Sequence, residues 1–184
     1  MERLIFLFLV IYGIERVLET FWKRKKIQGE IKAPYTLPLL IGLHVLIYMV
    51  SFWELLSLEN YQISWGITFG GMIMVLVSIA GRNWAIKALG LYHSIHIEIR
   101  ANHELIRSGP YRFVRNPYYL SNVIESVGLP LAVNARLGLL LSLFCYIPVV
   151  ILRMVLEERA LESKFKDLFF AYKRQVPRIL PKLL

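Results

Sequence analysis

The sequence predicts an all-α integral membrane protein with about five transmembrane helices. Hydrophobic residues make up 57% of the 184 residues and the mean hydropathy is +0.52, above the usual range of soluble domains. These residues come in long blocks, and a spanning helix needs roughly 20 consecutive apolar residues. Five blocks approach that length, over residues 3–22, 36–56, 65–86, 118–133 and 137–156. We expect one membrane domain over 1–184, with N-terminal helices in 1–87.

The first block carries Glu15, Arg16 and Glu19 in its second half and ends without a small-residue cleavage site, so we expect it to stay in the protein rather than act as a signal peptide. Basic residues lie mainly between the blocks. Four follow the first block at 23–26, none lies in 57–64, six lie in 82–117 and seven in 157–184. By the positive-inside rule, this distribution predicts an external N-terminus and a cytoplasmic C-terminus. The net charge of +9 is therefore explained by the membrane topology rather than by a basic binding face, and we expect no nucleic-acid partner.

The fourth and fifth blocks are separated by only Asn134-Ala135-Arg136. Two helices joined by so short a turn must run side by side. The segment before the fourth block, 82–117, and the tail after the fifth, 157–184, should therefore meet at the cytoplasmic face. Both segments carry charged and aromatic side chains, so their meeting point is a candidate site.

Within 82–117, Ile95, Ile97 and Ile99 alternate with polar residues, which predicts a short strand and turn. Two Xaa-Pro pairs follow, at 109–110 and 116–117, and the fourth helix should begin at Pro117, the favoured first-turn position. In the tail, apolar residues at helical spacing predict an amphipathic interfacial helix. They are Leu161, Phe165, Leu168, Phe169 and Tyr172.

Polar residues inside the apolar blocks are costly and mark candidate functions. Arg153 lies one turn before Glu157, and Asn122 and Glu125 share one side of the fourth helix. We expect Asn122 and Glu125 to line a substrate site, with the alternative that Glu125 pairs with Arg153 or Arg136 for structure alone.

Other candidates have plainer interpretations. The spacing of Gly66, Gly70 and Gly71 fits close helix packing. His93 and His96 lack a third ligand in a convincing pattern, so we expect no metal site. Cys145 is the sole cysteine and excludes an internal disulfide.

Two motifs together resemble the isoprenylcysteine carboxyl methyltransferase (ICMT) family and its phospholipid methyltransferase relatives. The first runs from His103-x-Leu105 through Ser108-Gly109-Pro110-Tyr111-Arg112 to Arg115-Asn116-Pro117-x-Tyr119. The second runs from Arg153-x-x-x-Glu157-Glu158 to Val176-Pro177-Arg178. The resemblance covers roughly 88–182, which makes 88–184 the methyltransferase-like region.

The resemblance implies methyl transfer from S-adenosyl-L-methionine, bound in a cytoplasmic loop region, to a lipophilic or prenylated acceptor that enters from the membrane lipids. The expected acceptor is an isoprenoid or other lipophilic molecule that carries a carboxylate, as in isoprenylcysteine, or a hydroxyl, a thiol or an amine. The family's cofactor contacts correspond to His96, His103, Leu105, Ile106, Tyr111, Arg115, Asn116, Pro117, Tyr118, Tyr119 and Glu157. Arg153 corresponds to a substrate position, and we expect Arg153 and Glu157 to be the catalytic pair. Aromatic faces suit a sulfonium, and a guanidinium can hold a carboxylate by two hydrogen bonds.

Two positions depart from the family pattern. Asn116 stands where histidine is usual, and Ser121 where glycine is frequent. Asparagine keeps the hydrogen bonds but cannot carry a proton, so a role that needs a titrating imidazole is in doubt.

Two other classes of protein remain as alternatives. Membrane sterol-type reductases resemble the family in their C-terminal helices and use a reduced nicotinamide. A non-catalytic lipid-binding or transport relative would keep the fold without the activity.

Overall fold

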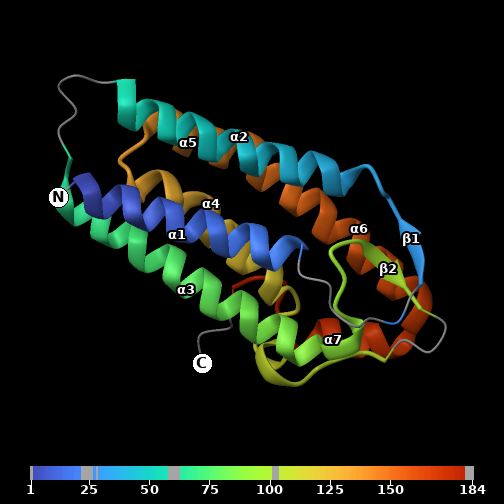
Figure 1. The fold of residues 1–184 in the computed structure, drawn as a ribbon. Coiled ribbons are helices and arrows are strands. Elements are labelled where there is room, and N and C mark those ends of the chain that lie inside the picture. The colour runs from blue at the N-terminus through green and yellow to red at the C-terminus, as the bar shows by residue number, and fades with distance from the viewer. Residues whose placement is uncertain (1, 22–26, 28, 58–62, 101–103, 181–184) are drawn as a thin grey trace.

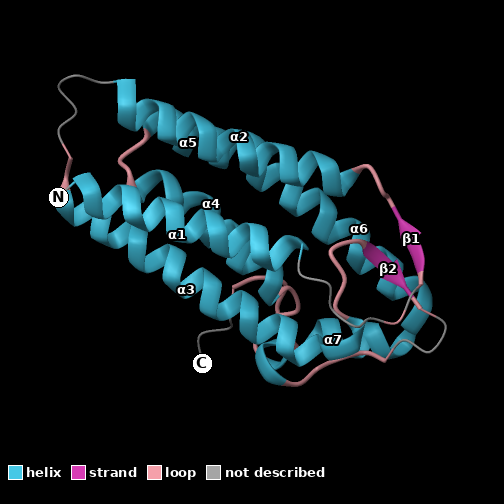
Figure 2. Cartoon of the chain, viewed as in Figure 1, coloured by secondary structure: helices cyan, strands magenta, loops and turns pink. Residues whose placement is uncertain are grey.

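The computed structural model describes residues 2–21, 27, 29–57, 63–100 and 104–180. Long helices lie side by side along the molecule, and a small two-stranded sheet stands at one end of them (Figure 1 and Figure 2). The main helices are α1 (Glu2–Phe21), α2 (Thr36–Ser57), α3 (Trp65–Leu89), α4 (Pro117–Ala132), α5 (Arg136–Leu141), α6 (Ile147–Phe165) and α7 (Asp167–Gln175). A π-helical turn, η3 (Ser142–Tyr146), joins α5 to α6, so that 136–165 is helical throughout.

Among the described residues, three helical stretches are long and apolar enough to cross a membrane: Thr36–Ser57, Trp65–Tyr92 and Arg136–Phe165. The prediction of a mostly helical membrane protein is therefore confirmed. Helix α4 has only 16 residues, and α1 carries three charged residues near its end. Both lie within the bundle in Figure 1. The count of five transmembrane helices stays a prediction.

Helices α3 and α4 are in close contact because glycines remove side chains from their interface. A Cβ at Gly71 would overlap the backbone nitrogen of Ala132, and one at Gly128 would lie 2.8 Å from the Cβ of Met74. The packing role predicted for Gly71 is confirmed. Gly66 and Gly70 face open space, with no atom within 4 Å of the position that a Cβ would take, so this prediction is wrong for them.

The predicted strand is β2 (Ile97–Ile99), and its antiparallel partner β1 (Glu30–Lys32) was not predicted. Gly29 precedes β1 and lies so close to the sheet that a Cβ would come within 2.5 Å of the Ile99 carbonyl oxygen. Its backbone N–H donates to the Glu98 carboxylate at 2.6 Å. The segment after α1 is thus held against the segment that follows α3.

The predicted start of the fourth helix at Pro117 is confirmed, whereas the tail differs from its prediction. Leu161 and Phe165 belong to α6, which ends at Phe165 and is followed by Lys166, a residue with φ +46°. Phe169 and Tyr172 on the short α7 are buried against Leu161 and Phe165. The prediction of a single amphipathic helix over 161–172 is therefore wrong, because the backbone turns at Lys166 and α7 packs back onto the protein.

Candidate functional site

The two charged segments meet where α4 begins and α6 ends, through the carboxylate of Glu158. Arg115 donates to Glu158 Oε1 at 3.1 Å and Asn116 Nδ2 donates to the same oxygen at 2.8 Å. Arg178 donates to Glu158 Oε2 at 2.8 Å. The backbone N–H of Arg115 also donates to the Pro177 carbonyl at 2.9 Å. These contacts fasten the C-terminal tail to the first turn of α4.

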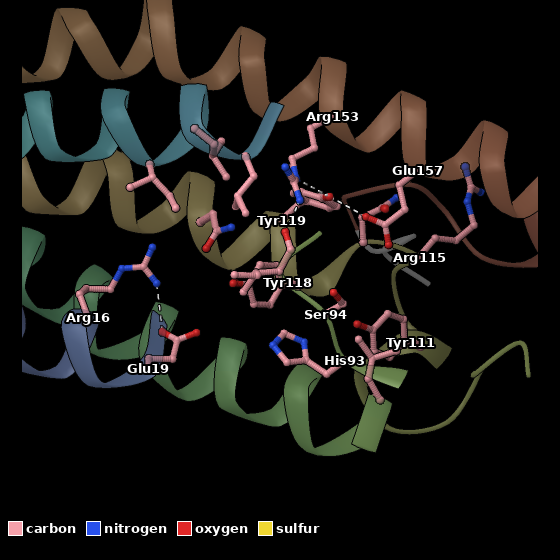
Figure 3. Close-up of a pocket in the computed structure, with 17 residues that line it drawn as sticks. Arg16, Glu19, His93, Ser94, Tyr111, Arg115, Tyr118, Tyr119, Arg153 and Glu157 are labelled. Carbon is pink, nitrogen blue, oxygen red and sulfur yellow. Dashed lines mark hydrogen bonds and ion pairs between the residues drawn. The ribbon is translucent and has the colours of Figure 1, made fainter. Parts of the chain in front are cut away.

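A second polar group, one turn earlier on α6, lies beside this cluster. The Tyr119 hydroxyl donates to Glu157 Oε2 at 2.6 Å, and Arg153 Nε donates to the Tyr119 oxygen at 3.2 Å. Arg153 also donates to Thr36 Oγ1 at 2.9 Å and to the Ile95 carbonyl. Arg153 therefore joins α6 to the start of α2 and to the segment before β2, and Figure 3 shows it beside Tyr119 and Glu157.

Two cavities adjoin this group and share part of their lining. The bundle cavity has an empty volume of about 780 Å³, open mouth included, and is lined on one side by Leu37, Leu40 and Ile41 of α2. The loop cavity has about 740 Å³ and is lined by residues of β2, the 104–111 segment and α7. The residues that line both cavities are Leu89, Ser94, Tyr111, Arg115, Asn116 and Glu157.

The expected cofactor residues divide between these cavities. His96, Leu105 and Ile106 line the loop cavity. Tyr118 and Tyr119 line the bundle cavity, as do Arg153 and Asn122. Tyr111, Arg115, Asn116 and Glu157 line both. Pro117 opens α4 and lines neither cavity, and His103 lies outside the described residues.

Asn116 was expected to contact a cofactor, and its side-chain nitrogen has two protein partners instead. Besides Glu158, it donates to the Arg178 carbonyl at 3.2 Å, and its backbone N–H donates to the same carbonyl at 3.2 Å. Asn116 is 7% exposed. Its amide therefore holds the tail in place, while its surface contributes to the wall between the cavities.

Glu125 pairs with neither of the arginines expected, Arg153 and Arg136. It lies 2.7 Å from Arg82 and 3.4 Å from Arg16, with its own side chain 0% exposed. Arg82 also contacts Glu19 at 2.5 Å and Glu15 at 3.1 Å. We call these five residues, contributed by α1, α3 and α4, the ionic cluster.

The ionic cluster reaches the bundle cavity through Arg16 and Glu19, which line its end away from Glu157 (Figure 3). These two residues were absent from the predicted site, although their charge inside an apolar block was a signal for it. Nothing in the sequence identified Arg82 as their partner.

Tyr111 stands at the wall between the cavities and keeps its proton. Burial, and then the nearby Glu157 carboxylate, raises the pKa of the Tyr111 phenol well above its ordinary value. Its backbone carbonyl accepts a hydrogen bond of 2.6 Å from Tyr172 of α7. The phenol is thus a fixed, neutral group that can donate a hydrogen bond at physiological pH.

Several known proteins are similar to this chain in sequence. The Bacillus subtilis protein YpbQ is 26% identical over 135 residues, which cover 73% of this chain and 77% of YpbQ. The cobalt-zinc-cadmium resistance protein CzcN of Cupriavidus metallidurans is 35% identical over 118 residues, covering 61% of this chain and 48% of CzcN. The nickel-cobalt-cadmium resistance protein NccN of Alcaligenes xylosoxydans is 30% identical over 115 residues. The chain spans about half the length of these two resistance proteins.

The profile of the isoprenylcysteine carboxyl methyltransferase family matches residues 71–163. The match begins inside α3, earlier than the resemblance read from the motifs, and includes α4, the site segment and most of α6. It spans Tyr111, Asn116 and Glu157, which line both cavities, and Arg153, which lines the bundle cavity. This chain therefore belongs to the isoprenylcysteine carboxyl methyltransferase family, a family of membrane methyltransferases.

Proposed function

We propose that the protein transfers a methyl group from S-adenosyl-L-methionine to a lipophilic acceptor. The observation that carries the proposal is the shared wall between the cavities. A methyl group moves in line from donor to acceptor, so the two molecules must approach from opposite sides with their reacting atoms in contact. Two cavities that meet at Tyr111, Asn116 and Glu157 provide that arrangement.

The loop cavity suits the cofactor. S-adenosylmethionine supplies a methyl group on a sulfonium cation and carries an ammonium, a carboxylate and ribose hydroxyls. Glu98, Glu104 and Glu157 offer carboxylate acceptors, and Tyr92 and Tyr172 offer aromatic surface. The His96 Nδ1 atom is buried with no hydrogen-bond partner in the described part of the chain, so it can form a hydrogen bond with a ligand.

The bundle cavity suits a lipophilic acceptor. Leu37, Leu40, Ile41 and Leu89 give it apolar walls, and polar groups occur at its two ends. Helices α1 and α2 expose large apolar side chains, such as Leu7 of α1 and Val45 and Trp53 of α2, as membrane-embedded helices do. We expect the acceptor to enter from the lipid, with a prenylated carboxylate as the family's precedent.

The same proposal includes five membrane crossings, with the site and the C-terminus on the cytoplasmic side. The chain runs back and forth along the bundle through α1, α2, α3, α4 and the continuous helix 136–165 (Figure 1). The clustering of Lys and Arg in 82–117 and 157–184 supports a cytoplasmic location for that end.

Calorimetry with purified protein tests the cofactor. S-adenosylhomocysteine and a reduced nicotinamide are titrated separately, and binding of the first alone is expected. Binding of the nicotinamide alone would select a sterol-type reductase. Binding of neither would favour a non-catalytic lipid-binding or transport relative.

A further inference from the structure

We propose that the acceptor is a protonated nucleophile, that is a hydroxyl, thiol or amine, and that Glu157 accepts its proton during methyl transfer. The inference rests on the proposed function and narrows its acceptor. It removes the carboxylate from the acceptors that the family resemblance implies, because the arginines lining the bundle cavity already have partners. Three features of the site lead to it.

The first feature is the contrast between two neighbouring carboxylates on α6. Glu158 is 3% exposed and receives hydrogen bonds from Arg115, Asn116 and Arg178, two of which are cationic. Glu157 receives one, from the neutral Tyr119 hydroxyl. Within the described ranges, no Lys or Arg nitrogen forms an ion pair with Glu157. Its negative charge is therefore far less compensated than that of Glu158.

The second feature is the occupation of the arginines that line the bundle cavity. Arg153 is 3% exposed, and each of its three guanidinium nitrogens donates to Tyr119, Thr36 or the Ile95 carbonyl. Arg16 pairs with Glu19 at 3.0 Å and Arg115 pairs with Glu158 at 3.1 Å. A carboxylate acceptor would therefore have to share a guanidinium whose nitrogens already have partners.

A carboxylate acceptor would also meet the charge of Glu157 at the wall between the cavities. Two carboxylates that share a buried site repel one another, and one of them then takes up a proton. A neutral acceptor avoids this repulsion. Its proton can also form a hydrogen bond to Glu157, which would orient the nucleophile toward the loop cavity.

The third feature is the location of Glu157, which lines both cavities. As the acceptor's oxygen, sulfur or nitrogen bonds to the methyl carbon, the bond from that carbon to sulfur breaks and its electron pair stays on sulfur. The proton of the nucleophile passes to the Glu157 carboxylate. The products are the methylated acceptor, neutral S-adenosylhomocysteine and protonated Glu157, which can release its proton through the loop cavity.

Tyr119 acts as a positioning residue in this scheme. Its hydroxyl donates to Glu157 Oε2 and accepts from Arg153, which fixes the carboxylate against the wall. The groups nearest to Glu157 are Tyr119 of α4, Tyr111, and Arg153 and Glu158 of its own helix. Asn116 also lies beside Glu157 in the lining of both cavities, but an amide cannot take the proton.

The test compares acceptors that do and do not need a base. Purified protein and Glu157→Gln are given radiolabelled S-adenosylmethionine with a long-chain alkylphenol, a long-chain arylthiol already ionised at the assay pH, or dodecanoate. A general base contributes about 100-fold or more to rate. With saturating cofactor, Glu157→Gln should lower kcat for the alkylphenol at least 100-fold and for the arylthiolate less than tenfold. Wild type should use the alkylphenol at least tenfold better than dodecanoate.

Glu158→Gln is the matched control, since it removes the adjacent carboxylate, and it should reduce kcat for the alkylphenol and for the arylthiolate by the same factor. Equal losses for phenol and thiolate in Glu157→Gln would overturn the proton-accepting role. Preference for dodecanoate, or cofactor binding without transfer to the alkylphenol or the arylthiolate, would overturn the acceptor class. Failure to bind S-adenosylhomocysteine would instead refute the proposed function itself.

Discussion

Replacing Arg82 with methionine should destabilise the bundle, because the ionic cluster would lose the cation that joins three helices. The side chains of Arg82 and Glu125 are both 0% exposed and lie 2.7 Å apart. Removing one partner of a buried pair costs about 3–5 kcal/mol, since the other charge stays buried without it. Arg16 remains 3.4 Å from Glu125, so we expect a loss at the lower end of this range, about 3 kcal/mol.

In a chain of this size, 1 kcal/mol corresponds to a shift of about 2–4 °C in Tm, so Arg82→Met should melt about 6–12 °C lower. Thermal unfolding in detergent, followed by tryptophan fluorescence, measures the shift. Lys87→Met, an exposed position on the same helix, is the control and should change stability by about 0.5 kcal/mol or less.

The double variant Arg82→Met with Glu125→Leu gives a sharper result. It removes one charge of each sign and leaves Arg16 to pair with Glu19 at 3.0 Å. Replacement of a buried ion pair by apolar residues is often neutral or stabilising, so the double variant should recover part of the lost Tm. A loss below about 1 kcal/mol in Arg82→Met, or a double variant less stable than the single one, would refute this reasoning.

Three further predictions concern packing, the tail and topology. Gly71→Ala should destabilise by about 1–3 kcal/mol, whereas Gly70→Ala, with open space at its Cβ, should not, and equal Tm values would contradict the α3–α4 contact. Asn116→His should bind S-adenosylhomocysteine within about tenfold of wild type by calorimetry, because Asn116 mainly holds the tail; a larger loss would make it a cofactor ligand. Reporter fusions at Asn60 and Leu184 should label opposite sides of the membrane, and the same side would refute five crossings.

Hydropathy and turn chemistry predicted much of the fold because they act locally. The long apolar blocks predicted the helices, and Pro117 predicted where α4 begins. The short turn at 134–136 predicted that the start of α4 would meet the end of α6, as the contact of Asn116 with Glu158 confirms. Each of these conclusions needed only neighbouring residues.

Contacts between distant segments could not be predicted in the same way. Strand β1 has only three residues, and its pairing with β2 depends on how α1 and α3 end in space. Glu125 had several possible arginine partners in the sequence, and helix packing alone selects Arg82. From the sequence alone, the side chain of Asn116 could as well contact a cofactor. Its hydrogen bond to the Arg178 carbonyl depends on how the tail folds.

The central claim is that cofactor and acceptor occupy separate cavities that meet at Glu157. One substitution can be placed in each cavity, since Leu105 lines only the loop cavity and Leu37 lines only the bundle cavity. Calorimetric titration of S-adenosylhomocysteine into Leu105→Trp and Leu37→Trp, both checked for native Tm, is the direct measurement. Leu105→Trp should lose binding by at least tenfold, and Leu37→Trp should bind like wild type. The reverse pattern, or equal effects of the two, would contradict the assignment of the cavities.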